Sequence, residues 1–546
     1  MTLPLLLSVF AIPTISIPFV YLAGKKSPKA AAIFVALIAL VNMGLVAATI
    51  PSVLGPNHSY QESYTWIPDL SNTQFTLYVD GISVSVALIS LVLIFVASIY
   101  SINYMAGKKN LPAYYALLCM LSVGLVGVFL TSNMILFYIC WELMLVPAYF
   151  IVGEWGYRNS YKSAIKLFIY THIGAVFVLL GIGAIYWLTG TTEMFTLNGV
   201  QGAQSLLLGA NVDVVRWILI ALTAGFAVKM AVFPFHLWLP DAHSEAPAPM
   251  SALLSGVIIS AGAYAILRLS FGMVFPAVGL AFGTNFLYAL SIVGVVTAFF
   301  GSLLSLYAND IKRVIAYSSI AHMGYIMFGL SLSPVALAEG NPVLLSSGIA
   351  IAVVGTILHI VTHAASKGLF FLTAGGIMHQ TEKRDIREMG GLASKMPFST
   401  VSGMIAALSI AGAPPLACFV SEFFIFVGAI QIIQQPGGAG TFYIIPTALM
   451  LIATVFSLAY SLRFISKVYF GQSKEEQEIE QPPQDAHGSH DTHAPAVTTA
   501  VEGHSHKILD VPNYMKIALA ILIVLVVLIG IYPTFFLQLI QTVTFG

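Results

Sequence analysis

The sequence predicts an all-α polytopic membrane protein with about 14 transmembrane helices. Of its 546 residues, 58% are hydrophobic and only 8% are charged, whereas soluble domains carry roughly 25% charged residues. Apolar stretches of about 20 residues, long enough to cross a bilayer, recur along the chain. Basic residues are confined to alternate loops between these stretches. Together, the three observations exclude an ordinary soluble domain.

The predicted spans cover the chain from end to end. Their centres lie near residues 12, 40, 93, 121, 143, 176, 224, 259, 296, 322, 361, 415, 455 and 527. The first span lacks the basic n-region and the small-residue cleavage site of a signal peptide, so we expect it to remain as a helix.

Basic residues in the loops predict the orientation. They follow the first, third, fifth, ninth and eleventh spans: Lys25, Lys26, Lys29, Lys108, Lys109, Arg158, Lys162, Lys312, Arg313, Lys383, Arg384, Arg387 and Lys395. Intervening loops such as "TGTTEMFTLNGVQGAQ" contain no Lys or Arg. By the positive-inside rule, the even-numbered loops and both termini are expected outside.

Two predicted helices are interrupted by proline, which removes a backbone donor. Helix seven breaks at Pro234 and carries Lys229; helix twelve breaks at Pro414 and Pro415 and carries Glu422. Broken helices five positions apart are typical of inverted repeats in transporters. The predicted division is helices one to three (1–110), a first five-helix repeat (111–271), a second inverted repeat (284–470), a polar inside loop (471–511) and helix fourteen (512–546).

Glu142 and Lys229 are predicted to lie at matching depth near the middle of helices five and seven. A charged side chain at mid-bilayer costs roughly 2.5–3.5 kcal/mol on insertion scales, so such residues usually find partners and mark ion pathways. The two residues are therefore expected to pair. If the pair opens, Lys229 loses support for its charge and can release its proton. A static structural ion pair is the alternative.

A second group of ionisable residues lies on helix eleven, in "TILHIVTHAASKGLFF". His359, His363 and Lys367 are spaced four apart and stack along one helix face. This stripe at membrane depth predicts a proton relay, which His322 in helix ten extends. His172 is interpreted as a core histidine.

Other sequence features narrow the function. Acidic and basic residues balance at 23 each, which gives no case for nucleic acid as a partner. No Walker A motif, dinucleotide fingerprint or cysteine cluster is present, so the driving force is either an ion gradient or a redox partner. The histidines of the polar loop (His487, His490, His493, His504 and His506) could bind a transition metal, but a solvated linker is the favoured interpretation.

Three motifs resemble the antiporter-like proton-translocating subunits of respiratory complex I: "FAVKMAVFPFHLWLPDAHSEAPAPMSALLSG", "NDIKRVIAYSSIAHMGY" and "FVSEFFIFVGA". The likeness covers roughly residues 75–470, and Glu422 in its "SEF" context is most similar to the chain M type. The resemblance implies fourteen helices with inverted repeats at helices four to eight and nine to thirteen.

The resemblance also implies roles for single residues. Glu142 and Lys229 match the glutamate–lysine pair of the first half-channel, His322 and His363 the central axis, and Glu422 the terminal acidic residue. Ser260 stands where chain M proteins usually carry a lysine. Lys367 is similar to the helix-eleven lysine of chain L and cation-antiporter relatives, so the central protonatable site is expected there.

The sequence therefore predicts a proton-translocating subunit of a complex I-type NAD(P)H or other donor:quinone oxidoreductase. No cofactor is expected in this chain; quinone, flavin and iron–sulfur centres are expected in partner subunits of the membrane-embedded assembly. A prokaryotic cell membrane is the expected location, with a thylakoid or inner organellar membrane as alternatives. The rival functions are those of a structural spacer, of an Mrp-type Na⁺/H⁺ antiporter subunit and of a membrane-bound hydrogenase subunit.

Overall fold

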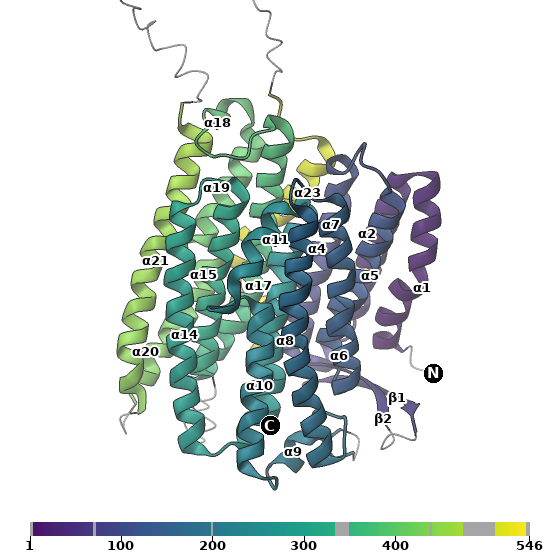
Figure 1. Ribbon diagram of the computed structural model, residues 1–546, viewed down its shortest axis with the longest axis vertical. Coiled ribbons are helices and arrows are strands. Elements are labelled where there is room, and N and C mark those ends of the chain that lie inside the picture. Colours follow the sequence, from purple (N-terminus) through teal and green to yellow (C-terminus); the bar gives the residue numbers. More distant parts are fainter. Residues whose placement is uncertain are drawn as a thin grey trace, which may run out of the picture.

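The protein is a bundle of long, nearly parallel helices in the computed structural model (Figure 1). The structure describes residues 4–68, 73–197, 200–333, 349–435, 439–472 and 508–541. Within these ranges, thirteen helical stretches are long and apolar enough to cross a membrane. The predicted twelfth span is divided into two shorter apolar helices. The integral, multi-pass, mainly helical architecture is thus confirmed.

The spans before the second half of the bundle begin and end as follows: α1 (Leu5–Lys26), α2 (Pro28–Ala47), α4 (Gly81–Tyr104), α5 (Leu111–Leu130), α6 (Met134–Leu143) continued by α7 (Leu145–Trp155), α8 (Ser160–Thr189), α10 (Val212–Met230) with η1 (Phe235–Trp238) and α11 (Leu239–Glu245), and α12 (Ala248–Leu253) continued by η2 (Leu254–Ile258), α13 (Ile259–Ala265), η3 (Ile266–Val274) and η4 (Phe275–Ala277). The segments η2 and η3 are π-helical, a geometry frequent at functional sites.

The remaining spans are α14 (Leu280–Tyr307), α15 (Ile311–Leu332), α17 (Ile349–Thr381), α19 (Pro397–Ile410) with α20 (Ala417–Ile433), η6 (Ala439–Tyr443) leading into α21 (Ile444–Ile465) and η7 (Ser466–Phe470), and α23 (Asn513–Ile531). Short helices lie in the connections: α3 (Ile50–Leu54), α9 (Ala203–Leu207), α18 (Leu392–Lys395) and α24 (Thr534–Gln541).

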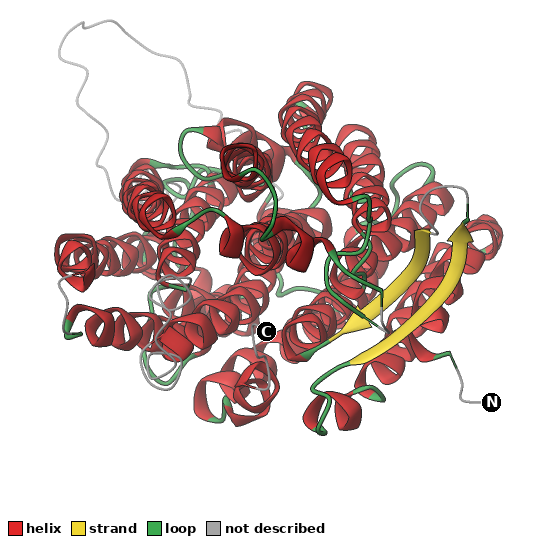
Figure 2. Cartoon of the chain, turned by 90° about the horizontal axis from the view of Figure 1, so that it is seen from below, coloured by secondary structure: helices red, strands yellow, loops and turns green. Residues whose placement is uncertain are grey.

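A β-hairpin that the sequence analysis treated as loop closes one end of the bundle. Strands β1 (Tyr60–Ile67) and β2 (Thr73–Val79) pair in antiparallel register, with Tyr60 opposite Val79. Figure 2 shows them lying across the helix ends near the N-terminus. The Glu62 carboxylate accepts the backbone N–H groups of Leu6 and Leu7 at 3.0 and 2.9 Å, so the hairpin caps α1, where a helix terminus favours negative charge.

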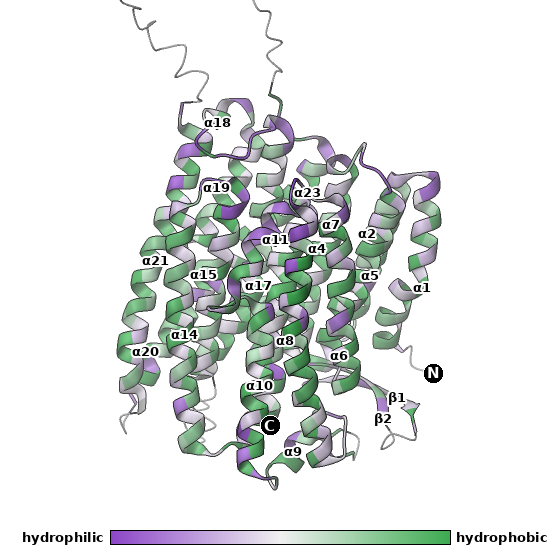
Figure 3. Cartoon of the chain, viewed as in Figure 1, coloured by the Kyte–Doolittle hydropathy of each residue, from purple (hydrophilic) through white to green (hydrophobic). Residues whose placement is uncertain are grey.

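The two ends of the bundle differ in charge. The basic loops predicted to lie inside are at the end that carries α18, which we call the basic end; the hairpin and α9 are at the opposite, hairpin end (Figure 1). Hydrophilic residues gather at the basic end in Figure 3. This segregation is the one that the positive-inside rule requires. The polar loop predicted at 471–511, with its His-rich stretch 483–507, lies mostly outside the described residues.

Both predicted breaks are present, and they run in opposite directions. α10 rises from the hairpin end and ends at Met230, with Ala231 in the left-handed region at φ +57°. α19 descends from the basic end and stops at Ile410, with Gly412 at φ +69°. Opposite directions are what inverted repeats require. The exact repeat boundaries, 111–271 and 284–470, stay a prediction.

Candidate functional site

Lys229 is buried in the last turn of α10, immediately before the helix breaks. Its ammonium group donates to the backbone carbonyl of Trp141 at 2.9 Å and lies 3.9 Å from the centre of that indole ring. The free carbonyls at the end of α10 add negative partial charge close to the lysine. The break therefore places a cation beside backbone oxygens and an aromatic face.

The predicted Glu142–Lys229 ion pair is not formed among the described residues. Glu142 follows Trp141 on α6, but its carboxylate instead lies 3.3 Å from Nδ1 of His172 on α8. A side chain one position along a helix points about 100° away from its neighbour. Lys229 thus reaches the Trp141 carbonyl, whereas Glu142 points to another face.

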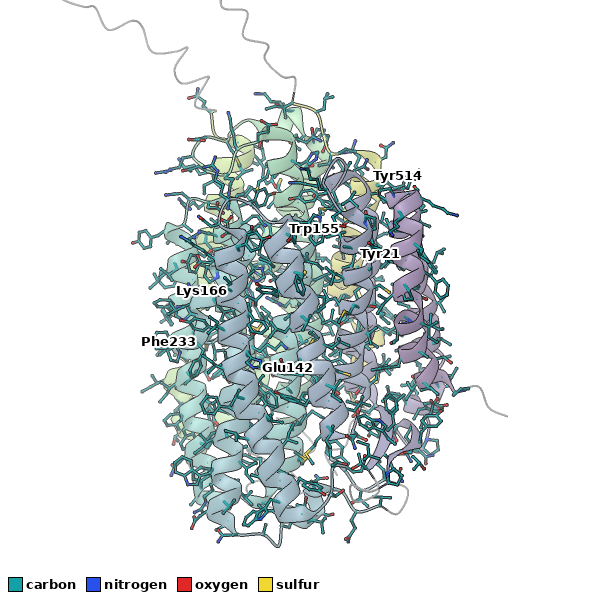
Figure 4. The ribbon with its side chains drawn as sticks, turned by 45° about the vertical axis from the view of Figure 1, so that its right-hand side comes forward. Tyr21, Glu142, Trp155, Lys166, Phe233 and Tyr514 are labelled. Atoms are coloured by element: carbon teal, nitrogen blue, oxygen red, sulfur yellow. The ribbon has the colours of Figure 1, made fainter. Side chains whose placement is uncertain are left out.

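His172 is not the core histidine that the sequence suggested. Its side chain is 48% exposed and that of Glu142 is 26% exposed. Figure 4 shows Glu142 on the outer surface of the bundle, below Lys166 on the same face. An ionisable pair on this surface at membrane depth needs cover, because lipid solvates charge poorly.

Polar cavities open at the basic end of the bundle. One of about 260 Å³ is lined by Asn159, Lys162, Ser163, Lys166, Asp241, Glu245 and Arg313. Asp241 joins its walls, since it pairs with Lys166 at 2.7 Å and with Arg313 at 2.8 Å. These ion pairs connect α8, α11 and α15.

The second half of the bundle contains the densest group of buried ionisable residues. Nδ1 of His322 on α15 lies 3.1 Å from Nε2 of His359 on α17. Glu422 on α20 approaches the same His322 nitrogen at 3.9 Å. His359 also contacts the Ser421 hydroxyl at 2.8 Å through Nδ1. The structure therefore brings together three predicted site residues that are far apart in sequence.

Lys367 continues this group toward the basic end. Its ammonium group donates to the Ser318 hydroxyl and, at 3.3 Å, to the Ile315 carbonyl, both on α15. His363 lies between Lys367 and His359 on α17, with its ring centre 5.7 Å from that of His322. Both ring nitrogens of His363 are buried without a hydrogen-bond partner in the described chain. Ser260 donates to the Gly256 carbonyl at 3.0 Å and contributes no charge.

Glu422 sits against the break between α19 and α20. A Cβ atom on Gly412 would lie only 2.5 Å from the Glu422 carboxylate. The neighbouring Pro414 and Pro415 are exposed, while Glu422 itself is 7% exposed. The absence of a side chain on Gly412 therefore makes room for the Glu422 carboxylate beside the break.

Gly412→Ala is expected to destabilise the protein and displace Glu422. The left-handed backbone costs a non-glycine residue about 1–2 kcal/mol, and the new methyl group would overlap the carboxylate. We expect a lower thermal unfolding temperature for the purified complex. Gly183→Ala on α8 is the matched control, since its Cβ would meet nothing within 4 Å. Equal unfolding temperatures for the two variants would contradict this account.

Several buried ionisable residues were not singled out from the sequence. Lys312, which the sequence places among loop charges, is fully buried and donates to the Ala246 carbonyl. His243 is buried against Phe371, with ring centres 4.9 Å apart and both nitrogens unpartnered among described residues. His243 lies in the motif "FHLWLPDAHSEAP", but a buried histidine is often an ordinary core residue. Only the fold shows that its ring nitrogens have no hydrogen-bond partner among the described residues.

A polar network near the hairpin end was also missed. Asn133 caps α6 and donates to Glu193 at 2.8 Å. Glu193 lies in the connection after α8, where burial raises its pKa against the opposing effect of this hydrogen bond. Asp80, which caps the start of α4, and Arg268 on η3 form a buried ion pair at 2.7 Å.

Comparisons with known proteins agree with this arrangement. Residues 131–437 match the family described as NADH:quinone oxidoreductase/Mrp antiporter, TM, and residues 66–115 match the N-terminal region of complex I chain 5. NADH-quinone oxidoreductase subunit M of Rickettsia typhi is 30% identical over 86% of this chain and 89% of its own length. The subunit M of Pseudomonas aeruginosa is 30% identical over 78% of each chain.

Other relatives carry different names. An Na(+)/H(+) antiporter protein of Alkalihalophilus pseudofirmus is 32% identical over 76% of this chain and 50% of its own length. Among solved structures, the Mrp complex of Dietzia matches with a TM-score of 0.79 and 20% identity, covering 99% of this chain and 97% of the other. Complex I of Thermus thermophilus matches with a TM-score of 0.76 and 19% identity, covering 98% of each. These likenesses establish the fold. The chain belongs to the NADH:quinone oxidoreductase/Mrp antiporter transmembrane family.

Proposed function

We propose that this chain is a proton-translocating subunit in the membrane arm of a complex I-type quinone oxidoreductase. The observation that carries the proposal is the row Glu422, His322, His359 and Lys367, all buried and drawn from three helices. Ionisable residues inside a membrane bundle are costly to bury and usually mark ion pathways. The relatives named NADH-quinone oxidoreductase subunit M add support.

The chemistry of the row suits protons. Imidazole accepts a proton on one nitrogen and releases one from the other. His322 and His359 are already within hydrogen-bond distance, and Glu422 ends the row at the helix break. Among the described residues, Lys367 donates to the neutral oxygens of Ser318 and Ile315, so no carboxylate holds its proton there. His363, between Lys367 and His359, has no hydrogen-bond partner for either nitrogen in the described part of the chain.

The first half supplies a switch centred on Lys229. In this structure the lysine is held by the Trp141 carbonyl, one residue before Glu142. In this proposal the lysine exchanges that carbonyl for the Glu142 carboxylate when the side chains rearrange. We infer that movement between these partners changes how firmly Lys229 holds its proton. The exposed Glu142–His172 pair is covered by a neighbouring membrane-arm subunit in this proposal.

Redox chemistry belongs to partner subunits in this proposal, together with quinone, flavin and iron–sulfur centres. The cysteines Cys119, Cys140 and Cys418 are buried and free, and none lies beside another. The bacterial subunit M relatives favour a bacterial cell membrane as the location. The basic end faces inside and the hairpin end, with both termini, faces outside.

Sodium transport is the second candidate, because an Na(+)/H(+) antiporter protein is among the relatives. Sodium prefers several oxygen ligands, whereas the buried row is dominated by imidazole and ammonium groups. Replacing Na⁺ by choline in sealed vesicles distinguishes the two. Unchanged proton uptake supports a proton path, and uptake that vanishes without Na⁺ favours the antiporter.

The Lys367→Met variant tests the proposal. We expect quinone-reductase turnover and proton uptake by vesicles holding the assembled complex to fall together, by roughly 10²-fold if Lys367 is an obligatory proton carrier. Lys26→Met, at an exposed position of α1, is the control. Full proton stoichiometry in Lys367→Met would refute the role of the buried row.

A further inference from the structure

The hydrogen bonds around His359 determine which of its nitrogens is bare. Ser421 donates its single hydroxyl hydrogen to the Cys418 carbonyl at 2.9 Å. The same Ser421 oxygen lies 2.8 Å from His359 Nδ1 and 2.9 Å from the Thr362 hydroxyl. With its hydrogen on the Cys418 carbonyl, it accepts from Nδ1. In a neutral imidazole only one nitrogen carries hydrogen. His359 Nε2 is then a bare lone pair, directed at His322.

The surroundings of His322 lead to the same result. The Tyr460 hydroxyl donates to Ser457 and lies 3.4 Å from His322 Nε2. Where the Tyr460 hydrogen points to Ser457, Tyr460 accepts from His322 Nε2 and Nδ1 carries a lone pair; the Ile410 carbonyl is a further partner of this ring. Two lone pairs then face each other across 3.1 Å, with a Glu422 oxygen 3.9 Å from the same His322 nitrogen. In this tautomer a cation between the members of the cluster would satisfy both nitrogens and the carboxyl oxygen.

A proton can be that cation, and so can a divalent transition metal. Tetrahedral Zn²⁺ with bonds of about 2.0–2.1 Å places its ligand atoms about 3.3 Å apart. The separations of 3.1 and 3.9 Å bracket that value, and all three ligand atoms lie within 4.8 Å of one another. Ser421 holds His359 from behind, as outer hydrogen bonds hold metal-binding histidines.

We propose that His322, His359 and Glu422 form a binding site for a Zn²⁺-type ion, which blocks the proton row by replacing its shared proton. Three protein ligands leave a fourth position for water. Glu422 lies at the helix break, beside Pro414 and Pro415, which are exposed in the isolated chain. Binding stands on the geometry alone; inhibition rests on the proposed function.

The test uses the assembled complex with Asn at His487, His490, His493, His504 and His506, so that the His-rich stretch of sequence cannot retain metal. Zinc bound after equilibration and gel filtration is counted by mass spectrometry, and its ligands are read by X-ray absorption. We compare the parent with His359→Gln and His359→Cys. His58→Gln, at an exposed position of the hairpin end, is the control.

We expect the parent and His58→Gln to hold one more zinc per complex than His359→Gln. His359→Cys should regain the ion with a sulfur ligand, which excludes misfolding as the cause of the loss. Zn²⁺ should also inhibit proton uptake in the parent vesicles. Equal zinc in parent and His359→Gln would overturn the site, whereas the Lys367→Met result, measured without zinc, judges the proton path separately.

Discussion

Replacing Lys229 by Met is expected to abolish coupled proton transport while leaving the bundle folded. Methionine matches the lysine stem in length and apolar character but cannot carry a proton. Removing a buried charge at a helix end also removes its desolvation cost, so stability should not fall sharply. A positioned proton-transfer group contributes roughly 10²–10⁴-fold, and we expect proton uptake to drop by at least the lower figure.

Proton uptake and quinone-reductase turnover should be recorded together in sealed vesicles. If the half-channels are tightly coupled, both fall. Lys26→Met makes the same chemical change at an exposed site and should have no effect. Turnover and proton stoichiometry that persist unchanged in Lys229→Met would make Lys229 a structural residue, bound to Trp141 for packing alone.

Replacing Glu422 by Gln is expected to stop transport through the second half. The amide keeps the shape of the carboxyl group beside Gly412, so the helix break should survive. It cannot bind and release a proton, and it leaves His322 without a carboxyl neighbour. We expect proton uptake to fall by roughly 10²-fold.

The matched control for Glu422→Gln is Glu154→Gln. Glu154 is exposed on α7 and accepts a hydrogen bond from Tyr161. It should keep full activity. A Glu422→Gln complex that pumps normally would show that protons leave the His322–His359 pair by another route and would remove Glu422 from the row.

The spans and breaks were predictable because they depend on local chemistry. Each apolar run of sufficient length became a helix, and Pro234, Pro414 and Pro415 lie where α10 and α19 stop. The spacing of His359, His363 and Lys367 on one face also follows from helix geometry alone. The hairpin was missed because its strands are short and mix polar with apolar residues, so they resemble a loop between two membrane segments.

Contacts between helices were less predictable. Glu142 and Lys229 were expected to pair on depth alone, yet Glu142 contacts His172 on α8 and Lys229 contacts the Trp141 carbonyl on α6. Asp80 and Arg268 form a buried pair although 188 positions separate them. The depth of a residue in the membrane can be counted along its helix. Which neighbouring helix its side chain contacts depends on how the helices pack together.

The sequence by itself determined that this protein lies in a membrane, which apolar runs form its long helices and where two of those helices break. Those features depend on the length of each apolar segment and on the backbone N–H that proline lacks, and both act within a single helix. The tertiary structure alone decided that His322, His359 and Glu422 meet, that Lys229 rests on a carbonyl and that Lys312 is buried. The physical reason is that hydrogen bonds act only over a few ångströms, and helix packing decides which side chains come that close.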